Sequence, residues 1–129
     1  MEKRNVIVIC LAVLLVACLI GSKDKSFEHT IDKKLHLIVN PKDSHVKFSS
    51  SPYAYIQAEE SRDDYNYIVS HGEKSLEYLL HKFAGSNDNG LQEYIMALAC
   101  ADILKEDPAS KDWASGREWY NDWLLGDKR

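Results

Sequence analysis

Few side chains in this sequence are both reactive and spaced so that they could act together. The five histidines are His29, His36, His45, His71 and His81. No two of them stand four residues apart, and none lies beside a pair of cysteines, so the spacing of zinc ligands is absent. His29, Asp32 and His36 share a predicted helix and could bind a metal, but without a further converging ligand we expect them to be solvated.

Two acidic pairs, Glu59-Glu60 and Asp63-Asp64, are the remaining candidates for acid–base chemistry. Paired carboxylates can hydrolyse glycosides. These pairs stand near the start of a predicted helix, where carboxylates favour the helix dipole, so we expect solvated side chains. Glycine-rich phosphate loops, serine nucleophile elbows and dinucleotide fingerprints are also absent from the sequence. We therefore predict no catalytic residue, no metal and no cofactor, and no enzymatic activity.

The first residues of the chain carry a different kind of chemistry. Lys3 and Arg4 precede an unbroken apolar run, Val6–Ile20, which is the pattern of an export signal. Inside that run lies the phrase Leu15-Val16-Ala17-Cys18. In it a small residue, Ala17, stands directly before the thiol of Cys18.

This phrase resembles the lipobox of bacterial lipoproteins. The resemblance implies a signal peptide over residues 1–17 and a lipidated Cys18 that opens a tether over residues 18–26. Cys18 would then carry a thioether-linked diacylglycerol and a further acyl chain such as palmitate, enough for stable anchoring at the extracytoplasmic face of the cell membrane. Leu19 and Ile20 extend the apolar run past the cysteine, so an uncleaved anchor over about Asn5–Gly21 remains the alternative.

The other cysteines follow from this interpretation. Cys10 lies in the leader and would be discarded, which leaves Cys100 without a disulfide partner. Because no base stands beside Cys100 in an apolar stretch, we expect a small buried core residue rather than a nucleophile.

Composition limits the class of protein. The 129 residues carry a formal charge of −4, and the leader contributes a net +1 through Glu2, Lys3 and Arg4, so the remainder carries −5. A mildly acidic chain has no electrostatic footprint for nucleic acid, and it repels anionic lipid weakly, so the anchor would hold it at the membrane. About a hundred residues, 27–129, are enough for one domain.

Helical periodicity dominates that domain. We expect a helix from Phe27, capped by Ser26 and stopped by Asn40-Pro41, although a hairpin pairing Leu35–Val39 with His45–Phe48 is the alternative. Residues 40–51 are predicted to be a loop, with Val46 and Phe48 touching the core. Further helices are expected to begin at Ser51-Pro52 and to cover residues 62–71, 74–84 and 91–104, and a last one begins with the capping box Ser115-Gly116-Arg117-Glu118.

The stretch Leu91–Leu104 is apolar around nearly its whole circumference, which is typical of a buried helix. The sequence therefore predicts an all-α fold, a small multi-helix bundle around this central helix. Together with residues 74–84 the stretch resembles a single HEAT-like helical hairpin, and no second copy appears at a fixed period.

Three phrases are similar to those of a group of small, uncharacterised exported proteins and lipoproteins from bacteria. They begin at Ser51-Pro52-Tyr53, at Gly90-Leu91-Gln92 and at Ser115-Gly116-Arg117. The likeness implies a related fold and brings no activity with it.

Aromatic residues near the carboxyl end are the best candidates for a binding surface. Trp119 and Trp123 stand four residues apart and are expected to dock the last helix, whereas for Trp113, which lies in a loop near Arg117, a partner-binding surface and a place in the core are both open alternatives. The sequence thus favours a membrane-anchored, extracytoplasmic, non-catalytic binding module with a protein partner in the cell envelope. An inhibitor or regulatory partner of another exported protein is the alternative, and a cell-envelope enzyme ranks last.

Overall fold

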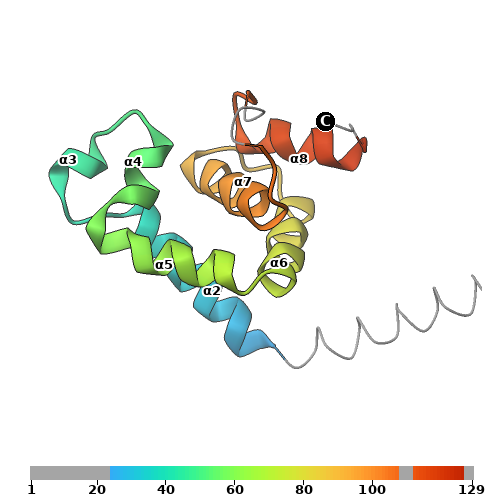
Figure 1. The fold of residues 1–129 in the computed structure, drawn as a ribbon, viewed down its shortest axis with the longest axis horizontal. Helices are drawn as coiled ribbons and strands as arrows, with labels where there is room; N and C mark the ends of the chain where they lie inside the picture. Colours follow the sequence, from blue (N-terminus) through green and yellow to red (C-terminus); the bar gives the residue numbers. More distant parts are fainter. Residues whose placement is uncertain (1–23, 108–111, 127–129) are drawn as a thin grey trace, which may run out of the picture. The chain divides into compact units, whose positions relative to one another are not determined.

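The computed structural model describes residues 24–107 and 112–126, and every regular element in these ranges is an α-helix (Figure 1). The helices are α2 (Lys25–Val39), α3 (Ser44–Lys47), α4 (Pro52–Gln57), α5 (Glu59–Ser70), α6 (Glu73–Ala84), α7 (Leu91–Ile103) and α8 (Gly116–Leu124). The all-α prediction is confirmed.

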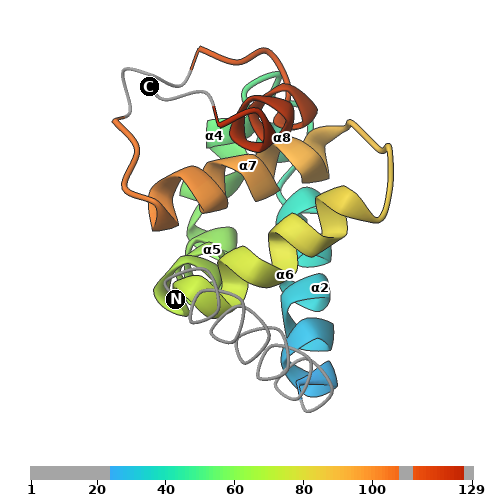
Figure 2. The same cartoon turned by 90° about the vertical axis from the view of Figure 1, so that its right-hand side faces the viewer.

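The chain divides into two compact units, residues 1–30 and residues 31–129. The helical bundle is the second unit, which α2 enters at Ile31. In that unit α7 is the central helix, because it contacts α4, α5, α6 and α8 (Figure 2).

The burial of α7 follows from its composition. Its side chains are buried without a break from Ile95 to Ala101, as expected for a helix that has no polar face over this stretch. Small alanines alternate with larger residues and allow the neighbouring helices to approach closely. The central helix predicted from the sequence is therefore confirmed, and it ends at Ile103, one residue earlier than expected.

Polar contacts join α2 to the helices that follow it. Ile31, Leu35 and Ile38 supply its buried stripe. On its flanks the Asp32 carboxylate accepts from Tyr78 Oη and from Lys82 Nζ, both at 2.8 Å, and Lys34 Nζ donates to Asp64 Oδ1 at 2.9 Å. The apolar period thus predicted a helix correctly, and the hairpin alternative is wrong. The helix starts at Lys25, so Ser26 lies inside it and is not its cap.

The predicted loop over residues 40–51 contains the short helix α3. Asp43 caps it, with its Oδ1 accepting from His45 N at 2.9 Å. Phe48 closes α3 and is 82% exposed, so the expectation that it touches the core is wrong. The buried positions near it are taken by Pro41 and Tyr55, and the Tyr55 hydroxyl donates to the Lys47 carbonyl at 2.8 Å.

The starts of the middle helices α4, α5 and α6 are marked by particular residues. Pro52 occupies the first turn of α4, as predicted. The next helix, α5, begins at Glu59 rather than at residue 62, and its first-turn carboxylates favour the helix dipole. Gly72 separates α5 from α6 with φ +57°, a left-handed conformation that a side chain would disfavour.

The last helix, α8, begins with the predicted capping box in a modified form. Ser115 Oγ accepts from Glu118 N at 3.1 Å, but the Glu118 carboxylate accepts from Ala114 N at 2.7 Å, one residue further back than the standard pattern. Gly116 then touches the backbone of α7, because a Cβ atom there would lie 2.1 Å from the Glu93 carbonyl oxygen. The close crossing of α7 and α8 therefore depends on the missing side chain.

Candidate binding surface

Trp113 is buried, not exposed. Only 3% of it reaches solvent, and its ring packs against Tyr94 with the ring centroids 4.7 Å apart. Its Nε1 has no hydrogen-bond partner among the residues that the structure describes. Of the two alternatives open for this loop residue, its burial supports a place in the core, because Tyr94 packs against its ring.

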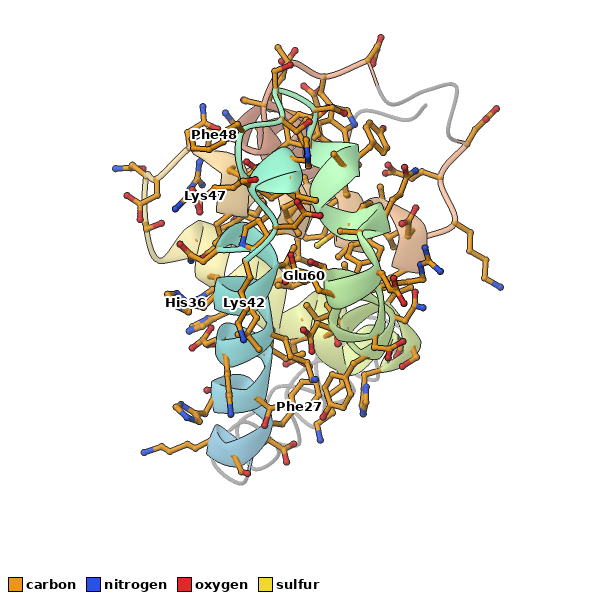
Figure 3. The ribbon with its side chains drawn as sticks, turned by 90° about the vertical axis from the view of Figure 1, so that its left-hand side faces the viewer. Phe27, His36, Lys42, Lys47, Phe48 and Glu60 are labelled. Atoms are coloured by element: carbon orange, nitrogen blue, oxygen red, sulfur yellow. The ribbon has the colours of Figure 1, made fainter. Side chains whose placement is uncertain are left out.

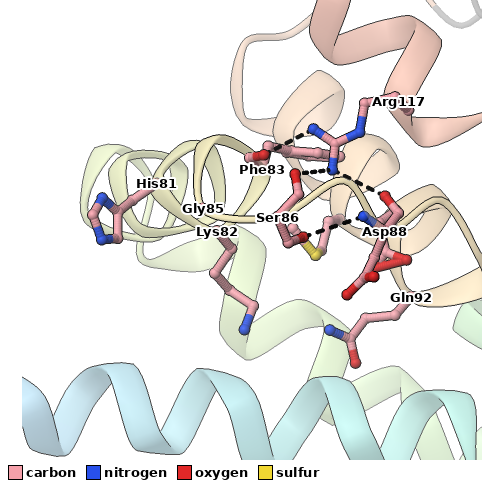
Figure 4. Close-up of a pocket in the computed structure, with 10 residues that line it drawn as sticks. His81, Lys82, Phe83, Gly85, Ser86, Asp88, Gln92 and Arg117 are labelled. Carbon is pink, nitrogen blue, oxygen red and sulfur yellow. Dashed lines mark hydrogen bonds between the residues drawn. The ribbon is translucent and has the colours of Figure 1, made fainter.

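Arg117 holds two parts of the fold together. Its Nη1 donates to the Phe83 carbonyl at 2.8 Å, and its Nη2 donates to the carbonyls of Ser86 and Asp88 at 2.8 and 2.9 Å (Figure 4). The guanidinium also lies over the rings of Phe83 and Tyr120. Arg117 thus fastens α8 to the turn that follows α6.

The Arg117 guanidinium is bonded to three neutral carbonyl oxygens and to no carboxylate among the described residues. Its Nε is buried without a hydrogen-bond partner among the same residues. A guanidinium has five N–H donors, so two remain after these three bonds. The positive charge next to the aromatic rings is therefore unneutralised within the described part of the chain.

A groove of about 490 Å³ lies beside this arginine. Its walls come from the end of α6, the turn after it, and one side of α8. The lining residues are Phe83, Ala84, Ser86, Asn87, Arg117, Tyr120, Asn121 and Leu124. Arg117 is the one residue of this lining that carries a formal charge.

An aromatic column leads from the core to the surface at the end of α8. Phe83 stacks on Tyr120, with an interplanar angle of 8° and 4.9 Å between the ring centroids, and Tyr120 stacks on Trp123 at 6.1 Å. Trp123 is 41% exposed, and it is followed by Leu124 and Leu125, which are 57% and 82% exposed. We call Trp123, Leu124 and Leu125 the apolar tip of α8.

The sequence predicted that Trp123 docks this helix together with Trp119, but the buried residues of α8 are Gly116, Trp119 and Tyr120. The exposure of the apolar tip could have been predicted from its position in the helix. Trp123 shares a helical face with Trp119 but lies one turn further on, at the end of the chain's last helix.

A second cavity of about 290 Å³ lies on the other side of Arg117, with His81, Lys82 and Gln92 among its lining residues (Figure 4). Two of its charged side chains, Lys82 and Glu93, form contacts within the fold. Lys82 pairs with Asp32, and the Glu93 carboxylate accepts from Gly90 N at 2.8 Å.

The remaining candidates for chemistry are occupied or buried. Among the described residues no group of three or more His, Cys, Asp or Glu side chains could hold a metal ion. Glu60 accepts from the backbone N–H groups of Lys42 and Asp43, and Asp64 pairs with Lys34. One member of each acidic pair, Glu60 and Asp64, thus acts in a structural contact, whereas Glu59 and Asp63 are exposed as predicted from the sequence.

Cys100 is fully buried in α7, as predicted. Burial, with a smaller contribution from Glu106, raises the pKa of its thiol far above the usual range. The neutral thiol is a core group and a poor nucleophile.

Cys18 and the lipobox phrase lie outside the described residues. None of the helices within 24–107 and 112–126 combines the length and the apolar composition that a bilayer span requires.

The chain was also compared with known proteins. No protein-family model, curated protein or solved structure matches it.

Proposed function

We propose that the chain is a lipid-anchored binding module of the extracytoplasmic face of the cell membrane, that it has no catalytic activity, and that it binds a protein partner through the apolar tip of α8 and the adjacent groove. The observation that carries this proposal is the exposure of Trp123, Leu124 and Leu125 next to each other at the end of α8. Single exposed apolar residues are normal on protein surfaces, but a cluster beside a groove is typical of interaction sites.

The tip rests on an ordered base, which favours binding. Trp123 stacks on Tyr120, and Tyr120 stacks on Phe83 in the core. Arg117 fixes the groove wall through three backbone carbonyls. A surface that is already ordered loses little conformational entropy when a partner binds, and tryptophan is enriched among the residues that dominate binding energy.

The lining of the groove indicates the chemistry of the partner segment. Its rings and Leu124 suit an apolar side chain, and the unneutralised charge of Arg117 suits a carboxylate close to that side chain. A partner segment that presents an apolar residue next to an acidic group, or next to its own terminal carboxylate, fits both features.

The anchor part of the proposal depends on the lipobox phrase Leu15-Val16-Ala17-Cys18 and its place at the end of a charged, apolar leader. A lipid anchor would confine the search for partners to proteins of the cell envelope. Within that compartment a binding module can act as an adaptor or as an inhibitor, and the α8 surface serves either role.

Photo-crosslinking tests the binding surface. A photoreactive residue at Leu125 of the full chain should capture the same envelope protein in repeated experiments, whereas the same group at Leu104, which is 40% exposed elsewhere on the surface, should not. The captured partner is then titrated against purified variants. Trp123→Ala should weaken binding at least about thirtyfold, the effect of a loss of about 2 kcal/mol.

Leu104→Ala is the matched control, because Leu104 and Trp123 are almost equally exposed. Its affinity should stay within about twofold of the original chain, since most surface contacts contribute little. Equal affinities of the Trp123→Ala and Leu104→Ala variants would show that the α8 tip is not the binding site.

A further inference from the structure

A second surface of the bundle carries exposed lysines and an exposed aromatic ring. It consists of the second half of α2 and the segment through α3, and Figure 3 shows four of its residues along these elements. We call it the basic face. Its members are Lys33, His36, Leu37, Lys42, Lys47 and Phe48, and all of them are exposed.

Formal charge is distributed unevenly along the second unit. Residues 31–50 contain four lysines and two aspartates, a net charge of +2, whereas residues 51–129 contain eight basic and fifteen acidic residues, a net charge of −7. The basic face is therefore the part of this acidic unit where positive charge gathers.

The lysines of the basic face are available for an external partner. Lys34 is engaged by Asp64, but Lys33, Lys42 and Lys47 form no ion pair with any residue in the described ranges. The Glu60 carboxylate accepts from the backbone N–H groups of Lys42 and Asp43, and the Asp43 carboxylate caps α3. These acidic side chains are held by the backbone instead of by the lysines.

Phe48 is presented on a fixed backbone. Its N–H donates to the Ser44 carbonyl at 3.1 Å, and the preceding carbonyl, that of Lys47, accepts from the Tyr55 hydroxyl. The ring nevertheless stays outside the core. An aromatic ring that is exposed and flanked by lysines is typical of surfaces that enter the boundary between lipid headgroups and acyl chains.

The length of the tether limits how far this face can lie from a bilayer. If Cys18 is acylated, as in the proposed function, seven residue-to-residue steps lead from it to Lys25, the first residue of α2. At about 3.3–3.6 Å per residue they span at most about 25 Å. The bundle is then held close enough to a membrane for a weakly attractive face to contact it repeatedly.

We infer that the basic face rests on the anionic lipid bilayer to which the chain is anchored, with Lys33, Lys42 and Lys47 contacting headgroup phosphates and Phe48 entering the interfacial layer. The inference rests on the proposed lipid anchor. Each lysine near an anionic surface is expected to strengthen the contact about fivefold. In Figure 1, α3 and α8 lie at opposite sides of α7, so the α8 tip stays free for a partner while α3 touches lipid.

Crosslinking to lipid tests the inference on the full chain, purified in detergent from the bacterial envelope and reconstituted into vesicles. One preparation carries a diazirine amino acid at Phe48, and the control carries it at Leu125, which has the same 82% exposure on the other surface. In vesicles of phosphatidylcholine and phosphatidylglycerol, position 48 should give at least tenfold more lipid adduct than position 125. In phosphatidylcholine alone the difference should shrink to about twofold.

Replacing the three lysines with glutamine should reduce the lipid adduct at position 48 to the level of position 125, even though the chain still floats with the vesicles. Flotation with equal adduct at both positions would overturn the basic face and leave the anchor intact. Adduct that is unchanged in the glutamine variant, or a protein adduct at position 48 in native membranes in place of lipid, would also overturn it. A chain that does not float with anionic vesicles would overturn both the anchor and this inference.

Discussion

Gly116 shows how much one absent side chain can decide. A Cβ atom at this position would lie 2.1 Å from the Glu93 carbonyl oxygen and 2.7 Å from Tyr94 N, both backbone atoms of α7. Because backbone cannot move aside as a flexible side chain can, Gly116→Ala should push α8 away from α7. We expect a loss of about 3 kcal/mol in the free energy of unfolding, measured by urea denaturation.

Gly85→Ala is the control for this change. A Cβ atom at Gly85 would lie 3.5 Å from its nearest neighbour, which is ordinary contact, and the backbone there does not require glycine. Its free energy of unfolding should change by less than about 1 kcal/mol. Similar losses in both variants would show that α8 does not need this close crossing.

Two buried groups predict a loss of stability at high pH. Burial raises the pKa of the Cys100 thiol, and burial together with the hydrogen bond to Asp102 raises the pKa of the Tyr65 hydroxyl. A raised folded-state pKa means that the neutral form is favoured in the fold. The contribution is therefore complete below the unfolded pKa, about 8.5 for Cys and about 10 for Tyr, and is lost as the pH rises above it.

The free energy of unfolding should accordingly decline above about pH 8.5. Between pH 9 and 10 the slope due to Cys100 approaches about 1.4 kcal/mol per pH unit, and Cys100→Ala should remove that part. Denaturation curves recorded at several pH values give the slope directly. A decline of the same steepness in Cys100→Ala would assign it to other groups.

At the residue scale, burial could be predicted from the sequence where the residue lies in a helix with a regular apolar pattern. Cys100 was predicted to be buried because apolar residues surround it on every side of a helix. Trp113 stands in an irregular segment, and its burial depends on Tyr94, nineteen residues earlier, which no local pattern reveals. Arg117 was predicted to be part of a binding surface. Its three carbonyl partners lie at the end of α6 and in the turn after it, which only the folded chain brings near.

At the scale of elements, α7 should dominate stability. Leu98 is completely buried in its middle, so Leu98→Ala should cost about 2–5 kcal/mol through lost burial and a cavity. Thermal and urea unfolding measure the loss. Leu125→Ala, at an exposed position, should change stability by less than about 0.5 kcal/mol. A similarly small loss for Leu98→Ala would contradict the central position of α7.

Helices with a long apolar stripe were predicted to within a few residues, whereas the short helix α3 was not predicted. α3 has four residues, too few for a periodic pattern, and its capping Asp43 was the one local signal. α5 begins three residues before its predicted start, since Glu59, Glu60 and Ser61 carry no apolar stripe. The exposure of Phe48 was missed for a related reason. Its neighbours give no hint that Tyr55 and Pro41 fill the nearby core.

At the scale of the whole molecule, the main prediction concerns the lipid anchor. The lipobox resemblance predicts that Cys18 becomes the first residue of the mature chain. Cys18→Ser should leave the precursor uncleaved and without lipid, because serine cannot form the thioether. Mass spectrometry of the amino terminus after membrane extraction distinguishes the forms. An intact Met1 on the membrane-extracted original chain would instead favour an uncleaved anchor.

The fold class and the central helix were therefore predictable from the sequence, because apolar period and composition determine them locally. The candidate surfaces were not. The α8 tip and the basic face both consist of residues that look like core or loop in one dimension. Their exposure depends on where a neighbouring helix ends, which is a property of the assembled bundle.

The hydrogen bonds from Arg117 to the turn after α6 restrict insertions in that turn. Residues 84–90 are exposed and rich in Gly, Asn, Ser and Asp, the composition of a segment that usually accepts insertions. Here two carbonyls of that turn, at Ser86 and Asp88, are bonded by a side chain from α8, and Asn89 Oδ1 accepts from Arg117 N. An inserted residue would move these acceptors out of register. A loop that looks free to vary is thus held at one length by a helix that begins 26 residues after the loop ends.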